Sequence, residues 1–367
     1  MKTVLKNTFP VCFLSETTLL IFNKGRFQIL DINTGDISKL VDFKMSLKER
    51  ILTKTPLFTR VLRKGVRCGI KVTDEIILFV IDQRIYELDI KNLLISEGFT
   101  TSDKSRPLAF SKIEGVEGFN DGIYFGGYKN NAQRNPISIY RRVQKDKWEE
   151  VYQFEPNKIE HIHHIIPDPY RNLVYIFTGD FDNTAGIWIA ENDFKSVKPL
   201  LIGEQIFRGC VGFSTASGLV YATDSPFSRN SIRLLKNTDD KWESIHLMDI
   251  NGPSIYGCQW DNDFVFSTSV EAGGRDEGIR YMLFCKKRGT GVIDNASHIY
   301  KGNLEDGFKD IYRVKKDGLP FFLFQFGVLI FPSELNVSPY LPVYHIATRK
   351  NGMNTVLLKN TLNKSAI

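Results

Sequence analysis

The sequence contains few cysteines, and their placement argues against two kinds of cross-linked protein. Only five are present, an odd number, and no two of them form a C-x-x-C pair. A disulfide framework needs paired cysteines, and a structural zinc site needs closely spaced ones. We therefore expect separate thiols in a reducing compartment. They are Cys12, Cys68, Cys210, Cys258 and Cys285.

Long apolar runs are also missing. No stretch approaches the ~18 consecutive apolar residues that a membrane-spanning helix needs. In the opening segment MKTVLKNTFPVCF, the residues Asn7, Thr8 and Pro10 interrupt any apolar core of a signal peptide. These two absences predict a chain that has no membrane span and is located in the cytoplasm.

The chain lacks a strong excess of charge of either sign. It has 48 Lys and Arg residues against 42 Asp and Glu residues, a net charge of +6, and no concentrated basic tract. Proteins that bind nucleic acid usually gather basic residues on one face or along one helix. Nucleic acid is therefore not indicated as a partner, whereas an acidic carbohydrate is consistent with the mild positive charge.

Helical periodicity over ten or more residues is almost absent, while short alternating apolar segments recur along the chain. Each recurring unit has a strand of small residues, a tight turn, an aromatic or aliphatic strand, a polar loop and two further strands. The period is about 45–50 residues. A four-strand unit at this spacing is typical of a β-propeller blade, which buries its faces against neighbouring blades.

We therefore predict an all-β fold: one β-propeller domain, residues 1–367, with seven blades of four antiparallel strands. Six blades are the alternative if the first and last units combine. The segment Lys44–Lys64 is predicted as a short helix or a long surface loop, and the aromatics of Phe321–Phe326 as strand residues of the core. The blades are predicted at residues 10–45, 65–100, 106–155, 160–203, 207–250, 253–303 and 310–360.

One unit contains a motif of a known superfamily. The segment IWIAENDFKSVKPL resembles the Asp-box of sialidase-like (BNR-repeat) propellers, Ser-x-Asp-x-Gly-x-Thr-Trp, with Asn192, Asp193 and Phe194 at the turn. Lys195 replaces the glycine, and the closing tryptophan is missing. The resemblance implies the sialidase-like fold. The sialidase active-site pattern, an arginine triad with a Tyr–Glu pair and an Asp, has no counterpart with diagnostic spacing, so the resemblance does not imply sialidase activity.

Ionisable residues recur at equivalent positions of the units. In a propeller, ligands bind where the innermost strands converge at one end of the central channel, so equivalent positions should face one another. A purely structural channel would favour small apolar residues there. The first strands contain Arg67, Glu114 or Glu117, His161, His163, Arg208 and Tyr256, and the ends of the second strands contain Asp180, Asp224, Ser269 and Glu271.

We predict catalytic roles for His161, His163 and Tyr256. The two histidines are two residues apart, so on a strand both side chains point to the same face, opposite to His164. Imidazole titrates near neutral pH, and a phenol also transfers protons. The alternative is a pair of channel histidines held by hydrogen bonds. Because the other histidines fall on different strand positions, we expect neither a metal ion nor a cofactor; they are His246, His298 and His345.

The remaining positions are predicted to bind substrate. Arg67 and Arg208 have guanidinium groups that hold a carboxylate through two parallel hydrogen bonds, and the alternative is a salt bridge between blades. Asp180, Asp182 and Asp224 end strands, where aspartate also caps turns. The predicted substrate-binding set is Arg67, Glu117, Asp180, Arg208, Asp224 and Glu271.

Two classes of function agree with these residues. The first is an enzyme that acts on an acidic poly- or oligosaccharide, either by β-elimination with arginine, histidine and tyrosine, or by hydrolysis with carboxylates such as Glu117, Asp180 or Glu271. The second is a non-catalytic propeller that binds a glycan or a protein in a bacterial surface-polysaccharide pathway. Convergence of the predicted residues on one pocket would favour the enzyme.

Overall fold

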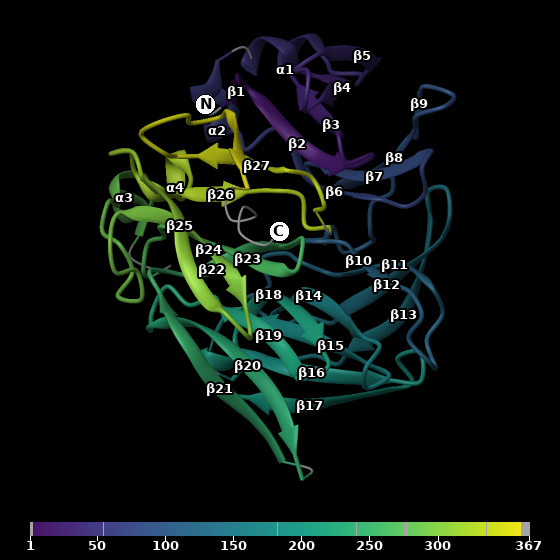
Figure 1. Cartoon of the computed structure of the whole chain (residues 1–367), viewed down its shortest axis with the longest axis vertical. Helices are drawn as coiled ribbons and strands as arrows, with labels where there is room; N and C mark the ends of the chain where they lie inside the picture. Colours follow the sequence, from purple (N-terminus) through teal and green to yellow (C-terminus); the bar gives the residue numbers. More distant parts are fainter. Residues whose placement is uncertain are drawn as a thin grey trace, which may run out of the picture.

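Seven four-stranded antiparallel sheets form the protein, whose structure is a computed structural model (Figure 1). The structure describes residues 3–53, 55–181, 183–239, 241–274, 278–334 and 336–360. The sheets follow one another in chain order around a central channel. This arrangement is a seven-bladed β-propeller, so the predicted fold class is confirmed.

In the first six blades the strands follow chain order, from the innermost strand to the outermost. The first blade contains β2 (Thr8–Phe13), β3 (Thr18–Asn23), β4 (Arg26–Asp31) and β5 (Ile37–Asp42). The second contains β6 (Val66–Lys71), β7 (Ile76–Ile81), β8 (Arg84–Asp89) and β9 (Leu94–Ile95). The third contains β10 (Ser111–Ile113), β11 (Gly122–Gly126), β12 (Ile137–Gln144) and β13 (Lys147–Phe154).

The next three blades have longer strands. The fourth contains β14 (His161–Asp168), β15 (Leu173–Gly179), β16 (Gly186–Glu191) and β17 (Ser196–Ile202). The fifth contains β18 (Gly209–Thr215), β19 (Gly218–Thr223), β20 (Asn230–Thr238) and β21 (Lys241–Ile250). The sixth contains β22 (Ser254–Trp260), β23 (Asp263–Thr268), β24 (Ala296–Asn303) and β25 (Gly307–Lys315). Because β25 pairs with β24, the sixth blade extends to Lys315, beyond the predicted boundary at residue 303.

The seventh blade joins the two ends of the chain. Its inner strands are β26 (Val328–Ile330), β27 (Tyr340–Ile346) and β28 (Thr355–Lys359), and the N-terminal strand β1 (Thr3–Leu5) is added at its outer edge. Val4 of β1 pairs with Val356 of β28. Since β1 completes the last blade while β2–β5 form a blade of their own, the ring closes with seven blades.

Glycines allow the inner strands of neighbouring blades to approach closely. Gly69 in β6 faces Val11 of β2, and Gly257 in β22 faces Val211 of β18. A Cβ atom at Gly257 would lie 2.4 Å from Val211 Cγ2 and 2.8 Å from the backbone oxygen of Val265. The small residues that recur in the first strand of the predicted units are therefore required by packing between blades.

The substitution Gly257→Val is expected to destabilise the protein by about 1–3 kcal/mol, because the added side chain overlaps a backbone atom that cannot move without disturbing β23. The comparison is Gly318→Val, at a glycine whose added Cβ would meet no atom within 4 Å. Urea unfolding of both variants measures the difference. If the two variants unfold at the same urea concentration, the inner strands can move apart at Gly257 without loss of stability.

Two short helices follow the first blade, where the sequence predicted a helix or a surface loop. Helix α1 (Leu47–Leu52) begins with a capping box, in which the Glu49 N–H donates to Ser46 Oγ and the Ser46 N–H donates to Glu49 Oε2. Helix α2 (Pro56–Val61) begins after the N-cap Thr55 and has proline at its first turn.

Arg60 connects α2 to the C-terminal part of the chain. Its Nη1 donates to Asp317 Oδ2 at 2.7 Å and its Nε donates to the backbone oxygen of Phe324 at 3.1 Å. The side chain is buried, so the ion pair is protected from solvent. This contact fixes α2 against α4 (Phe321–Phe324) beside the channel.

The Phe321–Phe326 segment differs from its prediction. Phe321–Phe324 form the helix α4, which follows Pro320 and ends at Gln325, where φ is 68°. Proline fixes its own φ and a residue with positive φ does not continue a strand, so the aromatic residues turn instead of extending. The other helical segments of the described residues are η1 (Gln205–Phe207) and α3 (Gly278–Phe284). Among the described residues, no helix has both the length and the apolar character needed to cross a membrane.

Candidate functional site

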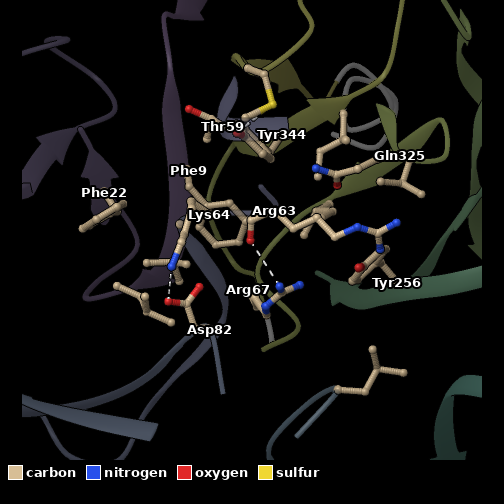
Figure 2. A pocket seen from close by; sticks show the side chains of 18 of the residues that line it. Phe9, Phe22, Thr59, Arg63, Lys64, Arg67, Asp82, Tyr256, Gln325 and Tyr344 are labelled. Carbon is tan, nitrogen blue, oxygen red and sulfur yellow. Dashed lines mark hydrogen bonds and ion pairs between the residues drawn. The ribbon is translucent and has the colours of Figure 1, made fainter. Parts of the chain in front are cut away.

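A cavity of about 350 Å³ opens at the end of the channel where the inner strands begin. We call this end the channel mouth. In the view of Figure 2, Arg67 lies between the Lys64–Asp82 ion pair and Tyr256. Most of the predicted site residues line the cavity, although they come from four different blades; they are Arg67, His163, Asp180, Arg208, Asp224, Tyr256 and Glu271.

The two predicted histidines contact each other beneath the cavity. Their Nε2 atoms are 3.0 Å apart. His161 Nδ1 is 3.1 Å from the backbone oxygen of Lys129, and His163 Nδ1 is 2.9 Å from that of Gly209. His163 lines the cavity, and His161 lies behind it. Burial lowers the pKa of His163 to about 4, and it lowers the pKa of His161 well below its usual value, so both rings are neutral near pH 7.

Asp180 follows the end of β15 and completes this group. Its Oδ1 lies 3.2 Å from His163 Nε2 and 3.4 Å from His161 Nε2. The preceding residue, Gly179, makes room for the imidazole, because a Cβ atom there would lie 2.2 Å from His163 Cε1. The two histidines and Asp180 are therefore held in contact by backbone that only glycine permits at this point.

Arg208 forms a salt bridge between two blades, which was the alternative to substrate binding in the sequence. Its Nη2 lies 2.9 Å from Asp180 Oδ1 in the fourth blade and 3.3 Å from Asp224 Oδ2 in the fifth. Its Nη1 donates to the backbone oxygen of Asp180. All three side chains are buried. The guanidinium thus offsets two carboxylates at the cavity wall, and among the described residues its buried Nε has no hydrogen-bond partner.

Glu271 is a buried carboxyl group at the cavity wall. It follows β23, and its side chain accepts a hydrogen bond from Ser269 Oγ. Burial, together with the negative charge of Asp224, raises the pKa of Glu271 to about 7, while Ser269 and Arg208 partly oppose the shift. A carboxyl group whose pKa lies near neutrality can exchange a proton with a ligand under physiological conditions.

Three arginines at the channel mouth have no acidic partner among the described residues. Arg67 Nη2 donates to the backbone oxygen of Arg63, and its buried Nε has no hydrogen-bond partner in the described part of the chain. Arg63 donates to the backbone oxygen of Phe322, and Arg106 donates to that of Pro107 and lies over the Tyr128 ring. In the part of the chain that the structure describes, no carboxylate forms an ion pair with any of the three. Burial, and then the charge of Arg106, lower the pKa of Arg67 to about 10.

Two tyrosines lie among these charges. Tyr256 and Tyr128 both line the cavity. Burial raises the pKa of each phenol to about 12, although the guanidinium groups of Arg106 and Arg67 oppose the shift at Tyr256. A neutral phenol near pH 7 is a proton donor, so Tyr256 is equipped to protonate an oxygen atom of a ligand.

Glu117 lies at the opposite end of the channel, which differs from its prediction. It follows the inner strand β10 instead of preceding it, and it exchanges hydrogen bonds with Asn172 in the turn after β14. Alignment of the units on their turns did not show at which end of the inner strand Glu117 lies. Glu114 is also exposed and pairs with Lys112. Asp182 lies outside the described residues.

The cavity also contains polar residues that were not predicted, among them Arg63, Arg106, Tyr128 and Cys210. Arg106 precedes β10 just as Arg208 precedes β18, and the segments RPLAFS and RGCVGFS are similar. Tyr128 is the second residue after β11, and its N–H donates to the backbone oxygen of Arg106 just as the Asp224 N–H donates to that of Arg208. A stricter alignment of the units would have found these two. Arg63 belongs to the segment after α2, which has no counterpart in other blades.

The comparisons with known proteins identify a fold and no family. No protein-family model matches the chain, and no curated protein matches it in sequence. An oligogalacturonate lyase in complex with manganese superposes with a TM-score of 0.56 at 13% identity, covering 98% of this chain and 90% of that chain. An oligogalacturonate lyase from Vibrio parahaemolyticus gives 0.54 at 11% identity, covering 97% and 90%. The β-propeller domain of Myceliophteria thermophila Cps50 (Swd1) gives 0.56 at 7% identity, covering 98% and 100%.

Identities this low show the propeller fold alone. The resemblance of IWIAENDFKSVKPL to an Asp-box therefore has no support from a sequence match. Its strand–turn–strand geometry is present, because β16 and β17 pair across a turn in which Asn192, Asp193 and Phe194 all have positive φ. The turn places Phe194 in the hydrophobic core beside Tyr124. This packing explains the conformation of the turn without a bound ligand.

Proposed function

We propose that this propeller binds an acidic oligosaccharide at the channel mouth and cleaves it by β-elimination next to a uronate residue. The observation that carries the proposal is the group of three arginines, Arg63, Arg67 and Arg106, which face the cavity without an acidic partner among the described residues. Arg67 and Arg106 are half-buried, and a half-buried cation without a counterion costs free energy that a bound carboxylate offsets.

Arg67 and Arg106 are the groups that bind the uronate carboxylate. A guanidinium binds a carboxylate through two parallel hydrogen bonds, and among the described residues the buried Nε of Arg67 has no hydrogen-bond partner. Neutralising the carboxylate makes the hydrogen on the adjacent carbon more acidic, because the negative charge that develops on the carboxylate oxygens is stabilised. Carboxylate binding and activation for elimination thus involve the same residues.

Glu271 and Tyr256 transfer the protons. The Glu271 carboxylate removes the proton from the carbon next to the uronate carboxylate, and the electron pair of that bond forms the new carbon–carbon double bond. The glycosidic bond to the neighbouring carbon breaks, and its oxygen leaves with the bonding pair and takes the phenolic proton of Tyr256. We prefer Glu271 to His163 as the base because both ring nitrogens of His163 already contact other polar atoms.

Hydrolysis is less well supported by the same residues. It needs two accessible carboxyl groups on opposite sides of the scissile bond. Asp180 and Asp224 form ion pairs with Arg208, and Asp82 forms one with Lys64. Glu49, which also lines the cavity, pairs with Lys64, so among the described residues each carboxylate at the cavity other than that of Glu271 is paired with a cation. The substrate class also agrees with the two oligogalacturonate lyases of the same fold, whose likeness to this chain is one of fold alone.

Incubation of the full chain with polygalacturonate, alginate and glucuronate-containing polysaccharides tests the proposal. Elimination produces a double bond conjugated with the carboxylate, so the expected result is a rise in ultraviolet absorbance. Titration calorimetry with the same saccharides measures binding separately. Binding without absorbance would show a non-catalytic glycan-binding propeller, and the absence of both would overturn the proposal.

A further inference from the structure

We propose that His161, His163 and Asp180 form a binding site for a divalent transition-metal ion at the floor of the channel mouth. This inference goes beyond the proposed function, since it depends on the buried side chains below the cavity and on no property of the saccharide. It also departs from the expectation of no metal, which rested on the absence of another histidine at an equivalent strand position.

The hydrogen bonds of the two imidazoles determine which nitrogens carry protons. Backbone oxygens only accept hydrogen bonds, so His161 Nδ1, next to the Lys129 oxygen, and His163 Nδ1, next to the Gly209 oxygen, must each donate. A neutral imidazole has one N–H group. Both Nε2 atoms therefore carry lone pairs, and these lone pairs point toward each other.

Asp180 adds a third acceptor to the same point. Its Oδ1 is 3.2 Å from His163 Nε2 and 3.4 Å from His161 Nε2, and the two Nε2 atoms are 3.0 Å apart. Three lone pairs in mutual contact repel one another unless a cation lies between them. A bound ion at about 2.0–2.2 Å from each donor places adjacent donors about 3.0–3.5 Å apart, which agrees with these distances.

The surroundings support the ligands in the way that metal sites require. Each imidazole is oriented by a backbone oxygen on its other nitrogen, and Arg208 Nη2 holds Asp180 Oδ1. The two carboxylates of Asp180 and Asp224 face the single guanidinium of Arg208, which leaves one negative charge beside the neutral imidazoles. This charge favours a cation.

The cavity side offers further donors. His163, Cys210 and Asp224 have ligand atoms within 4.8 Å of one another. Asp224 is buried, and within the described part of the chain its Oδ1 has no hydrogen-bond partner. An ion held by His161, His163 and Asp180 therefore has open positions toward this side. Imidazole and carboxylate donors suit Zn²⁺ and its first-row neighbours, whereas Ca²⁺ and Mg²⁺ prefer oxygen donors alone.

Calorimetric titration of the full chain with Zn²⁺, after treatment with a chelator, tests the site. We expect one ion per chain. In His161→Gln and His163→Gln, affinity should be at least about 100-fold weaker, since loss of a residue that only supports a ligand already costs about 10–100-fold. Co²⁺ added to the wild type should give the visible absorption bands of an ion bound to nitrogen, and both variants should lack them.

The matched control is His246→Gln. His246 is exposed on the outer strand β21 and contacts Asp249, far from the channel mouth. It should bind Zn²⁺ like the wild type. Thermal unfolding in chelator verifies that the site variants are folded, and the increase in melting temperature on adding Zn²⁺ should disappear only in them. If the wild type binds no stoichiometric Zn²⁺, or if His246→Gln loses binding as much as His161→Gln, the proposal is overturned and a shared proton joins the two imidazoles.

Discussion

Replacing Arg67 by alanine is expected to weaken the binding of a uronate oligosaccharide by about 10- to 100-fold. A hydrogen bond to a charged group contributes about 1.5–3 kcal/mol, and each 1.4 kcal/mol changes affinity tenfold. The stability of the protein should be unchanged or higher, because Arg67 has an unpartnered Nε and, among the described residues, no ion pair to lose. A residue that costs stability while it faces a cavity is expected to be retained for its ligand.

Titration calorimetry with an oligouronate, together with thermal unfolding, measures both effects. Arg67→Lys should fall between alanine and the wild type, because lysine keeps the charge without the planar pair of donors. The control is Arg26→Ala, which removes an exposed arginine that pairs with Asp42 on the first blade. Unchanged affinity in Arg67→Ala, or an equal loss in Arg26→Ala, contradicts a carboxylate site at the channel mouth.

The fold was predictable because each blade repeats the same physical requirements. Inner strands need small residues, as Gly69 and Gly257 show, and second strands need large apolar ones to fill the space between sheets. These requirements recur at a constant spacing, so the period revealed the architecture. The structure of segments outside the repeat was harder to predict. The aromatic residues after Pro320 have the composition of a strand, yet they form α4.

The candidate site was predictable only as far as strand positions allow. Asp180 and Asp224 follow equivalent strands, so their convergence could be expected, and the same logic failed for Glu117 because it lies at the other end of its strand. The contacts themselves could not be predicted. Arg208 contacts an aspartate of the preceding blade, and His163 contacts a backbone oxygen of the following one. Spacing along the chain determines which face a side chain occupies and leaves open which atom of a neighbouring blade it meets.

The substitution Glu271→Gln is expected to have opposite effects on activity and on stability. Elimination should slow by about 100- to 10,000-fold, because the amide cannot remove a proton. Stability at pH 8 should increase. The folded-state pKa of about 7 lies above the ordinary value of 4.5, so the folded protein binds more protons between these pH values. Stability of the wild type therefore falls as the pH rises through this window, by on the order of 1–3 kcal/mol.

Glutamine lacks this ionisation, so the melting temperature of Glu271→Gln should exceed that of the wild type at pH 8 and nearly equal it at pH 5. Glu334→Gln provides the matched control. Burial also raises the pKa of Glu334 to about 7, but its side chain accepts from the Lys71 N–H at the opposite end of the channel. It should show the same gain in stability at pH 8 and keep full activity.

The groups that face Glu271 are Asp224, Arg208, Cys210 and Ser269. If Glu271→Gln loses activity without gaining stability at pH 8, the positive charge of Arg208 already compensates the ionised Glu271 carboxylate. Equal activity in the two glutamine variants would exclude Glu271 as the base.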